Sequence, residues 1–312
     1  MLLKELSGSD GRKQTHVGSN AFFFPSQFVI LIAVMAARRY LSVGLVLALW
    51  LPCVRTAPAQ APAKTHVAGT LSVTDAGRWQ NLQNGVGFRT IALERSEPGY
   101  TIELKLLRCA GQLVVPRILH AGQFQLKAAS AKTFAEKSGA IAAVNANYFD
   151  EKGRPLAYLK TSAQEINRSV SKHALYTGIF GIGEAGPFVM HRDEFLPSQA
   201  TEALQSGPLL LRGAAPVELG INAARYARRT VIGIDKQGQM IVGVTDALAG
   251  GLSLSELQEL FRNGRWQLDA VDLLNLDGGG SAQLYVKSGK FEEWLPGTTE
   301  VPVGIGFFKR AN

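Results

Sequence analysis

The sequence contains very little cysteine and histidine. Of its 312 residues only Cys53 and Cys109 are cysteines, and Cys53 lies in an N-terminal segment that we expect to be removed. A single remaining cysteine forms neither an intramolecular disulfide nor a cysteine-based zinc site, so Cys109 is predicted to be a small buried residue. The histidines stand at no spacing typical of metal ligands; they are His16, His66, His120, His173 and His191.

The sequence also lacks any run of lysine and arginine interleaved with aromatic residues. The net charge is +8, and residues 1–59 contribute half of it, with six basic and two acidic side chains. Nucleic-acid-binding domains concentrate basic side chains in a patch or stripe, so we predict no nucleic-acid partner. The mild positive charge that remains suits an anionic substrate, such as a phosphate ester.

The N-terminus has the composition of an export signal. Two apolar runs, 21–37 and 40–51, are separated by Arg38 and Arg39, and small residues precede Gln60. A short basic segment followed by an apolar run and small residues is typical of a cleaved signal peptide. Each apolar run is shorter than the roughly 20 residues that span a bilayer. We therefore predict an exported protein, periplasmic or secreted. The competing interpretation is an uncleaved anchor, which would be its single link to a membrane.

These features divide the chain into three parts. We predict a leader over residues 1–59, in which translation starts at Met35 and residues 1–34 are a gene-start artefact. A linker rich in Ala, Pro and Thr is predicted over residues 60–80. The remaining residues, 81–312, contain no internal repeat and no second linker, and their length suits a single domain.

Local patterns within this domain predict strands and a few helices. The alternation of apolar and polar residues over 100–107 is typical of a half-buried strand, and 231–245 is typical of a hairpin. Ser130 is predicted to cap a short helix, and Ser253 with Glu256 forms a capping box for another. We predict a mixed α+β (α/β) fold: one domain with a mixed, largely antiparallel sheet packed with a few helices.

The most distinctive stretch is Asn275-Leu-Asp-Gly-Gly-Gly-Ser281, which follows an apolar run. Glycines allow a sharp turn and a close approach of a ligand to the backbone, and consecutive amides in such a turn can bind an anion. Asp277 stands beside these amides. The simpler interpretation is a tight connection between two strands, with Asp277 capping the turn.

Two further polar clusters stand at the ends of predicted strands. Asn145 and Asn147 follow an apolar run, at a place where such scaffolds often present functional groups, although both residue types also favour turns. Arg229 opens the predicted hairpin, and its planar guanidinium suits two phosphate oxygens. The neighbouring Arg225 and Arg228 are interpreted as a solvated basic loop.

Four segments in this order resemble the phosphodiester glycosidase family. They are 144–149 (VNANYF), 206–210 (SGPLL), 229–234 (RTVIGI) and 274–281 (LNLDGGGS), and the resemblance extends over about 88–309. Two departures stand out. Ala146 and Asn147 occupy positions where the family commonly has small residues such as glycine, and the stretch 245–251 is shorter than expected. These departures put the substrate in question rather than the fold.

The resemblance implies hydrolysis of a sugar 1-phosphodiester in a glycan or envelope polysaccharide, which releases a free sugar and a phosphate monoester. This reaction needs a group that positions the phosphate and a base for water. From the residue types we predict that Arg229 binds the phosphate and that Asp277 is the base, or else a ligand for a divalent cation. Asp246 is the second carboxylate candidate. The predicted substrate-binding residues are Asn145, Asn147, Ser206, Gly207, Thr230, Thr245, Gly278, Gly279, Gly280 and Ser281.

Two other functions stay open at this point. A non-catalytic module that binds an envelope polysaccharide could use the same scaffold, because fold does not determine function. A metal-dependent phosphodiesterase would need several carboxylates and histidines around metal ions, and the spacing of the histidines does not favour it. No cofactor is predicted with certainty; a divalent cation is an open alternative.

Overall fold

The computed structural model describes residues 64–162 and 164–311. The chain divides into two compact units, Met1–Ala57 and Pro58–Asn312, and every described residue belongs to the second. The predicted leader and the first four residues of the predicted linker therefore lie outside the described residues. No helix in the described part of the chain combines the length and the apolar character needed to cross a bilayer.

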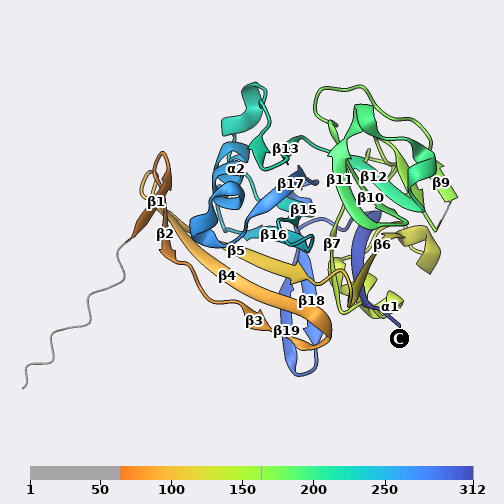
Figure 1. Cartoon of the computed structure of the whole chain (residues 1–312), viewed down its shortest axis with the longest axis horizontal. Coiled ribbons are helices and arrows are strands. Elements are labelled where there is room, and N and C mark those ends of the chain that lie inside the picture. The colour runs from red at the N-terminus through yellow and green to blue at the C-terminus, as the bar shows by residue number, and fades with distance from the viewer. Residues whose placement is uncertain (1–63, 163, 312) are drawn as a thin grey trace, which may run out of the picture. The chain divides into compact units, whose positions relative to one another are not determined.

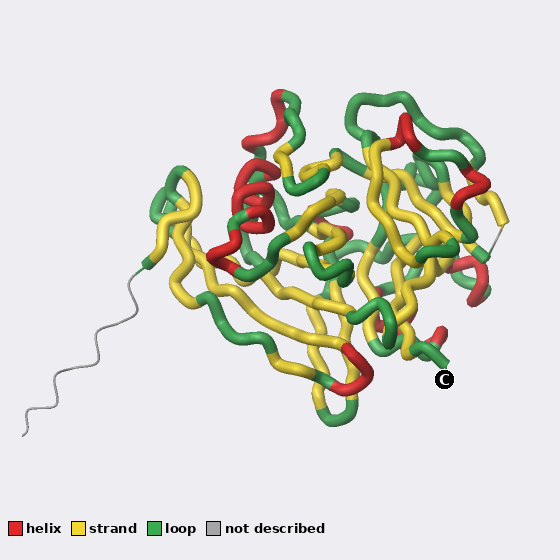
Figure 2. Tube along the Cα trace, in the orientation of Figure 1, coloured by secondary structure: helices red, strands yellow, loops and turns green. Residues whose placement is uncertain are grey.

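Antiparallel strands predominate in the second unit, and they form three sheets (Figures 1 and 2). The largest sheet has the order β1 (Thr65–Ala68), β2 (Leu71–Asp75), β4 (Val86–Arg95), β5 (Tyr100–Cys109), β16 (Met240–Asp246), β15 (Thr230–Asp235), β17 (Ala270–Asn275), β13 (Leu209–Arg212) and β14 (Ala215–Pro216), and β3 (Gln80–Asn81) pairs with β4.

The other two sheets contain five strands each. One has the order β11 (Gly186–His191), β10 (Gly178–Gly183), β12 (Glu202–Ser206), β8 (Leu159–Thr161) and β9 (Gln164–Asn167). The other has the order β19 (Phe291–Leu295), β18 (Leu284–Ser288), β7 (Ala142–Asn145), β20 (Val303–Lys309) and β6 (Val114–His120).

The two α-helices each pack on one sheet. Helix α1 (Ala131–Ser138) contacts β7, β18 and β20, and α2 (Leu254–Arg262) contacts β13 and β17. Both begin as the sequence predicts. The hydroxyl of Ser130 accepts a hydrogen bond from the N–H of Thr133, and Ser253 forms a capping box with Glu256. These side chains satisfy N–H groups that the first helical turn leaves without partners.

One core joins the three sheets. Buried apolar side chains from all of them, among them Leu107, Phe180 and Ile305, form a single cluster. Cys109 belongs to it and is completely buried, as predicted; burial raises the pKa of its thiol to about 12. A second cluster lies between the largest sheet and α2. Burial of apolar surface on this scale is the main stabilising contribution to the fold.

The structure corrects the sequence analysis in two respects. The strand pairings are all antiparallel within the described residues and belong to three sheets, so the prediction of one mixed sheet is wrong, whereas the predictions of largely antiparallel pairing and few helices are confirmed. The prediction of a linker is wrong for residues 65–80, because β1, β2 and β3 extend the largest sheet there. The alternate side chains Leu71 and Val73 are buried, and two such residues give too short a pattern for detection.

Candidate active site

The four segments singled out in the sequence come together where the three sheets meet. Segments 144–149, 206–210 and 274–281 contain the ends of β7, β12 and β17, and segment 229–234 contains the beginning of β15 and most of its length. The N–H of Asp277 donates to the carbonyl of Ala146 at 2.9 Å, and the N–H of Leu276 donates to the carbonyl of Thr230 at 2.8 Å. Residues far apart in the sequence are therefore held together by backbone hydrogen bonds.

Asn145 connects three of these segments. Its Nδ2 donates to the carbonyl of Asp277 at 2.7 Å. Its Oδ1 accepts from the hydroxyl of Thr230 at 2.7 Å and from the N–H of Gln283 at 3.2 Å. The side chain is 0% exposed, and it holds the site together. Asn145 and Thr230 thus bond within the protein, and their direct contact with a substrate stays a prediction.

Replacement of Asn145 by alanine is expected to lower the free energy of unfolding by about 3 kcal/mol, because it leaves several buried polar groups without partners. Urea denaturation measures this change. Asn147→Ala is the matched control, since no group in the described residues bonds the side-chain oxygen of Asn147, and about 1 kcal/mol or less is expected. Equal destabilisation by both variants would contradict the connecting role of Asn145.

Thr245 determines the backbone position of Arg229. Its hydroxyl accepts from the N–H of Arg229 at 2.5 Å and lies 3.0 Å from the carbonyl of the same residue. Thr245 is completely buried at the end of β16. Like Thr230, it was predicted to bind substrate, and the structure instead places its hydroxyl against the backbone.

A cavity of about 310 Å³ opens beside these segments. Its polar lining comes from Tyr148, Arg225, Arg229, Asn275 and Asp277. Among the described residues that line it, Asp277 is the single carboxylate. The cavity therefore brings one acid and two arginines to the same space.

The guanidinium of Arg229 is held by two backbone carbonyls. Nε donates to the carbonyl of Leu252 at 3.1 Å, and Nη2 donates to that of Arg225 at 2.6 Å. The pKa of Arg229 is lowered overall, mainly because the guanidinium is buried. The phenol of Tyr148 raises this pKa and the positive charge of Arg225 lowers it further. Within the described residues no carboxylate pairs with Arg229, so its charge is available to an anionic ligand.

Asp277 is mostly buried at the end of β17. Burial raises the pKa of its carboxyl group, and hydrogen bonds from the hydroxyl of Ser281 and the N–H of Gly278 oppose this shift. A carboxyl group with a raised pKa is a stronger base than an ordinary aspartate once it is ionised. Such groups often occur at functional sites, and Asp277 lines the cavity.

Two amides of the glycine turn bond within the protein, and one of them bonds Asp277. The N–H of Gly278 donates to Oδ1 of Asp277 at 2.9 Å, and the N–H of Gly279 donates to the carbonyl of Arg228 at 2.8 Å. A Cβ atom at position 278 would lie 2.6 Å from that carbonyl oxygen, so only glycine fits there. The N–H groups of Gly278 and Gly279, which were predicted to contact phosphate, therefore already have acceptors within the protein. Ser281 is buried, and its hydroxyl faces Asp277.

Sequence reasoning did not select Tyr148 and Asn275, which also line the cavity. The hydroxyl of Tyr148 lies 3.0 Å from the carbonyl of Gly207 and accepts from Nδ2 of Asn275 at 3.0 Å. Burial and the charge of Asp277 raise the pKa of Tyr148, and Arg229 lowers it. Both residues lie inside the four segments, and this position was the one feature of the sequence that could have selected them. Their contacts with each other could not be predicted from the sequence.

Asp246, Ser206 and Asn147 are among the predicted residues that lie outside the lining of the cavity. Asp246 ends β16, and its charge raises the pKa of Arg228, which burial lowers. Ser206 and Asn147 are buried, and each has a side-chain oxygen with no hydrogen-bond partner among the described residues. Of the two predicted carboxylates, Asp277 lines the cavity and Asp246 does not. Gly207 contributes its carbonyl, which holds Tyr148 and Asn275 beside the cavity.

Arg228 is not the solvated residue that the sequence predicted. Its Nη2 donates to the carbonyl of Ala282 at 2.7 Å and to that of Pro296 at 3.0 Å. Its own carbonyl accepts from the glycine turn, so Arg228 holds that turn against β15. Arg225 is exposed, as expected of a loop residue, but it also lines the cavity.

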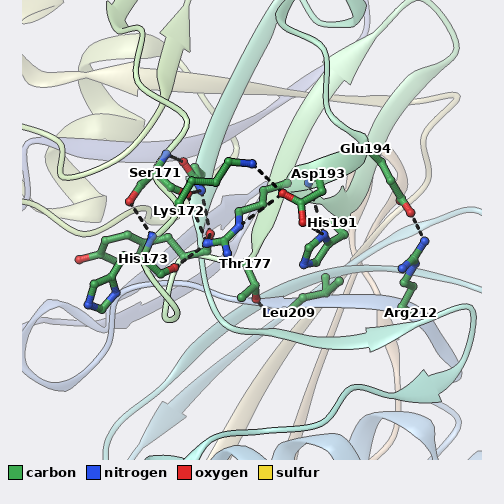
Figure 3. A network of polar contacts seen from close by, with 12 residues as sticks. Ser171, Lys172, His173, Thr177, His191, Asp193, Glu194, Leu209 and Arg212 are labelled. Carbon is green, nitrogen blue, oxygen red and sulfur yellow. Dashed lines mark hydrogen bonds and ion pairs between the residues drawn. The ribbon is translucent and has the colours of Figure 1, made fainter.

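A loop over residues 171–177 contributes Leu175 to the wall of the cavity. Arg192 donates to the carbonyls of His173 and Tyr176 at 2.5 and 3.1 Å, and Gln205 donates to that of Tyr176 at 2.7 Å. Figure 3 shows this loop together with the ion pair of Lys172 and Asp193 and the contact of Thr177 with Leu209. These bonds hold the wall against β11, β12 and β13.

Metal-ligating side chains do not gather in the part of the chain that the structure describes. No group of three or more His, Cys, Asp and Glu side chains is placed there so that it could hold a metal ion. In the cavity, Asp277 and the side-chain oxygen of Asn275, which has no partner among the described residues, are the available oxygen ligands.

The fold and the cavity define a mostly antiparallel β protein with one carboxylate and two arginines at the meeting point of three sheets. The model of the phosphodiester glycosidase family matches residues 138–308, and the chain belongs to this family. This confirms the resemblance found in the four segments. No curated protein matches the sequence.

Two solved structures are similar in fold. A hypothetical protein from Synechocystis has a TM-score of 0.57 and 15% identity; the match covers 77% of this chain and 65% of that one, slightly less than two thirds. The catalytic domain of zebrafish N-acetylglucosamine-1-phosphodiester alpha-N-acetylglucosaminidase, auto-inhibited by its pro-peptide, has a TM-score of 0.55 and 16% identity, and the match covers 80% and 87%. At these identities the likeness concerns the fold alone.

Proposed function

We propose that the protein hydrolyses the glycosidic C–O bond of a sugar 1-phosphodiester in a glycan or envelope polysaccharide and releases a free sugar and a phosphate monoester. Membership of the family supports this reaction type. The observation that carries the proposal is the cavity in which a carboxyl group with a raised pKa and an arginine without a carboxylate partner in the described residues face the same space.

Each reacting group has a role in this proposal. Arg229, with Arg225 at the rim, binds the phosphate by charge and by its planar array of donors. Ionised Asp277 accepts a proton from a water molecule whose oxygen attacks the anomeric carbon. The bond between that carbon and the phosphate oxygen breaks, and the electron pair leaves with the phosphate. Because a phosphate monoester is a good leaving group, protonation by a general acid contributes less than it does for an ordinary glycoside.

The proposed location is outside the cytoplasm, in the periplasm or the medium. It rests on the composition of residues 1–59, which lie outside the described residues. An exported enzyme would meet phosphate-linked glycans of the cell envelope directly. Sequencing of the N-terminus of the exported protein tests this proposal, and a start at Gln60 is the expected result.

Heavy-oxygen water distinguishes the candidate reactions. The purified protein is incubated with an N-acetylglucosamine 1-phosphodiester in labelled water, and the products are analysed by mass spectrometry. We expect the label in the free sugar, since water attacks carbon. Label in the phosphate would mean P–O cleavage, as in a metal-dependent phosphodiesterase, and would contradict the roles of Asp277 and Arg229.

The binding module is the other outcome of this experiment. It predicts binding of a polysaccharide without turnover, for several sugars and with or without added divalent cations. Asn147 keeps this alternative open, because its side chain replaces a smaller residue beside Tyr148. Turnover of any sugar 1-phosphodiester, lost in the Asp277→Asn variant, would exclude it.

A further inference from the structure

A buried ion pair lies next to the cavity but does not line it. Arg95, at the end of β4, is completely buried, and its Nη1 and Nη2 donate to the two carboxylate oxygens of Glu256 at 2.7 and 2.8 Å. Its Nε donates to the hydroxyl of Tyr100, the residue opposite it in the ladder of β4 and β5, at 2.9 Å. The roles proposed above do not use this cluster.

The guanidinium of Arg95 also contacts two loops beyond the ion pair. Its Nη2 donates to the carbonyl of Gly251 at 3.2 Å. Its central carbon lies 3.8 Å from the centre of the ring of Tyr226, which stacks on it as a cation–π pair. Tyr226 is 45% exposed and forms no part of the lining of the cavity.

These two contacts stand beside the carbonyls that hold Arg229. Tyr226 directly follows Arg225, whose carbonyl accepts from Nη2 of Arg229, and Gly251 directly precedes Leu252, whose carbonyl accepts from Nε. The two loops are joined to each other as well. The N–H of Leu252 donates to the carbonyl of Ala227 at 2.9 Å.

We propose that Arg95 is a positioning residue for Arg229: through Tyr226 and Gly251 it holds the two loop carbonyls that orient the guanidinium toward the cavity. This inference rests on the proposed function, in which Arg229 binds the phosphate. A buried ion pair is weak evidence for stability, because desolvation offsets the attraction of its charges. Arg95 contacts the residues next to both carbonyls, so the ion pair can influence how the guanidinium of Arg229 is oriented.

The packing of the second loop supports this role. A Cβ atom at Gly250 would lie 2.2 Å from the hydroxyl oxygen of Tyr100, the same hydroxyl that accepts from Arg95. The turn that precedes Leu252 therefore lies directly on the Arg95 cluster. Release of either loop lets the guanidinium of Arg229 take more orientations, and ordering it on binding then costs affinity for phosphate.

Tyr226 offers a test that preserves the buried pair, since removal of Arg95 would leave the charge of Glu256 without a partner and destabilise the protein. Binding of inorganic phosphate to the full chain is measured by calorimetry for the wild type and for Tyr226→Ala, Tyr226→Phe and Arg229→Ala. We expect Tyr226→Ala to weaken binding about fivefold, as loss of a cation–π contact near the surface predicts. Tyr226→Phe keeps the ring and is expected to bind within about twofold of the wild type.

The outcomes separate this inference from the proposed function. If Arg229→Ala weakens phosphate binding and Tyr226→Ala does not, the positioning role of Arg95 is wrong and the proposed function stands. If Arg229→Ala has no effect, phosphate does not bind at Arg229 and both fail. Equal weakening by Tyr226→Phe and Tyr226→Ala would assign the effect to the hydroxyl of Tyr226. The inference that Arg95 acts through the stacked ring would then be wrong. A melting temperature that stays constant in Tyr226→Ala while affinity falls supports positioning over a general structural role.

Discussion

Asp277→Asn is expected to reduce kcat for a sugar 1-phosphodiester by about 10³-fold, the contribution of a well-placed general base. Asparagine has nearly the same shape and keeps the acceptor for the N–H of Gly278, so ligand binding is expected to persist. Steady-state kinetics and calorimetry with inorganic phosphate measure the two effects separately. Activity within about tenfold of the wild type would show that Asp277 is not the base.

The same variant is expected to be at least as stable as the wild type. Burial raises the pKa of Asp277, so the folded protein binds this proton more tightly than the unfolded chain does. The contribution of Asp277 to stability is therefore fully present below the ordinary carboxyl pKa of about 3.9 and is lost as the pH rises through the raised value. At neutral pH the ionised group is buried at a cost, and asparagine removes that cost.

Two controls belong to this prediction. The acid limb of the pH profile of kcat/KM is expected above the ordinary carboxyl pKa of about 3.9, because the base must be ionised. Asp246→Asn is the matched variant: the sequence proposed both carboxylates, but Asp246 does not line the cavity, so a loss of less than about tenfold is expected. A larger loss in Asp246→Asn than in Asp277→Asn would exchange their roles.

Arg229→Ala is expected to lower kcat/KM by about 10²- to 10³-fold, as removal of a group that stabilises developing charge does in other enzymes. The thermal melt is expected to change little, because the guanidinium bonds only two loop carbonyls and forms no ion pair within the described residues. Kinetics together with a thermal melt check both statements. A collapse of the melting temperature would show that Arg229 is structural.

Arg229→Lys is the matched control for this variant. Lysine keeps the positive charge but has no planar fork, so it cannot bond the carbonyls of Leu252 and Arg225 and a phosphate in the same way. Activity between those of the wild type and Arg229→Ala is therefore expected. Full activity in Arg229→Lys would mean that charge alone is sufficient and that the fixed orientation of the guanidinium contributes nothing.

Local elements could be predicted because their causes are local. The alternation in β5 follows from a strand with one buried face, and the capping boxes follow from N–H groups within four residues of the cap. The division into three sheets could not be predicted, because pairing joins strands as distant in the sequence as β5 and β16. The alternation of apolar and polar residues in a strand does not identify its partner. The short strands β1, β8 and β14 carry too few buried residues for a periodic signal.

The family, the four segments and the candidate pair Asp277 and Arg229 could be predicted from the residues alone, because residue type limits which groups bind phosphate or accept a proton. Which polar groups reach the cavity could be seen only in the folded arrangement of the strands. Asn145, Thr230 and Thr245 are buried away from the cavity and form hydrogen bonds within the protein. Tyr148 and Asn275 also bond each other, but they line the cavity together with Asp277. Buried polar groups must find partners within the protein, so only groups that folding places at the wall of the cavity can also meet a ligand. These positions depend on strands that are distant in the sequence.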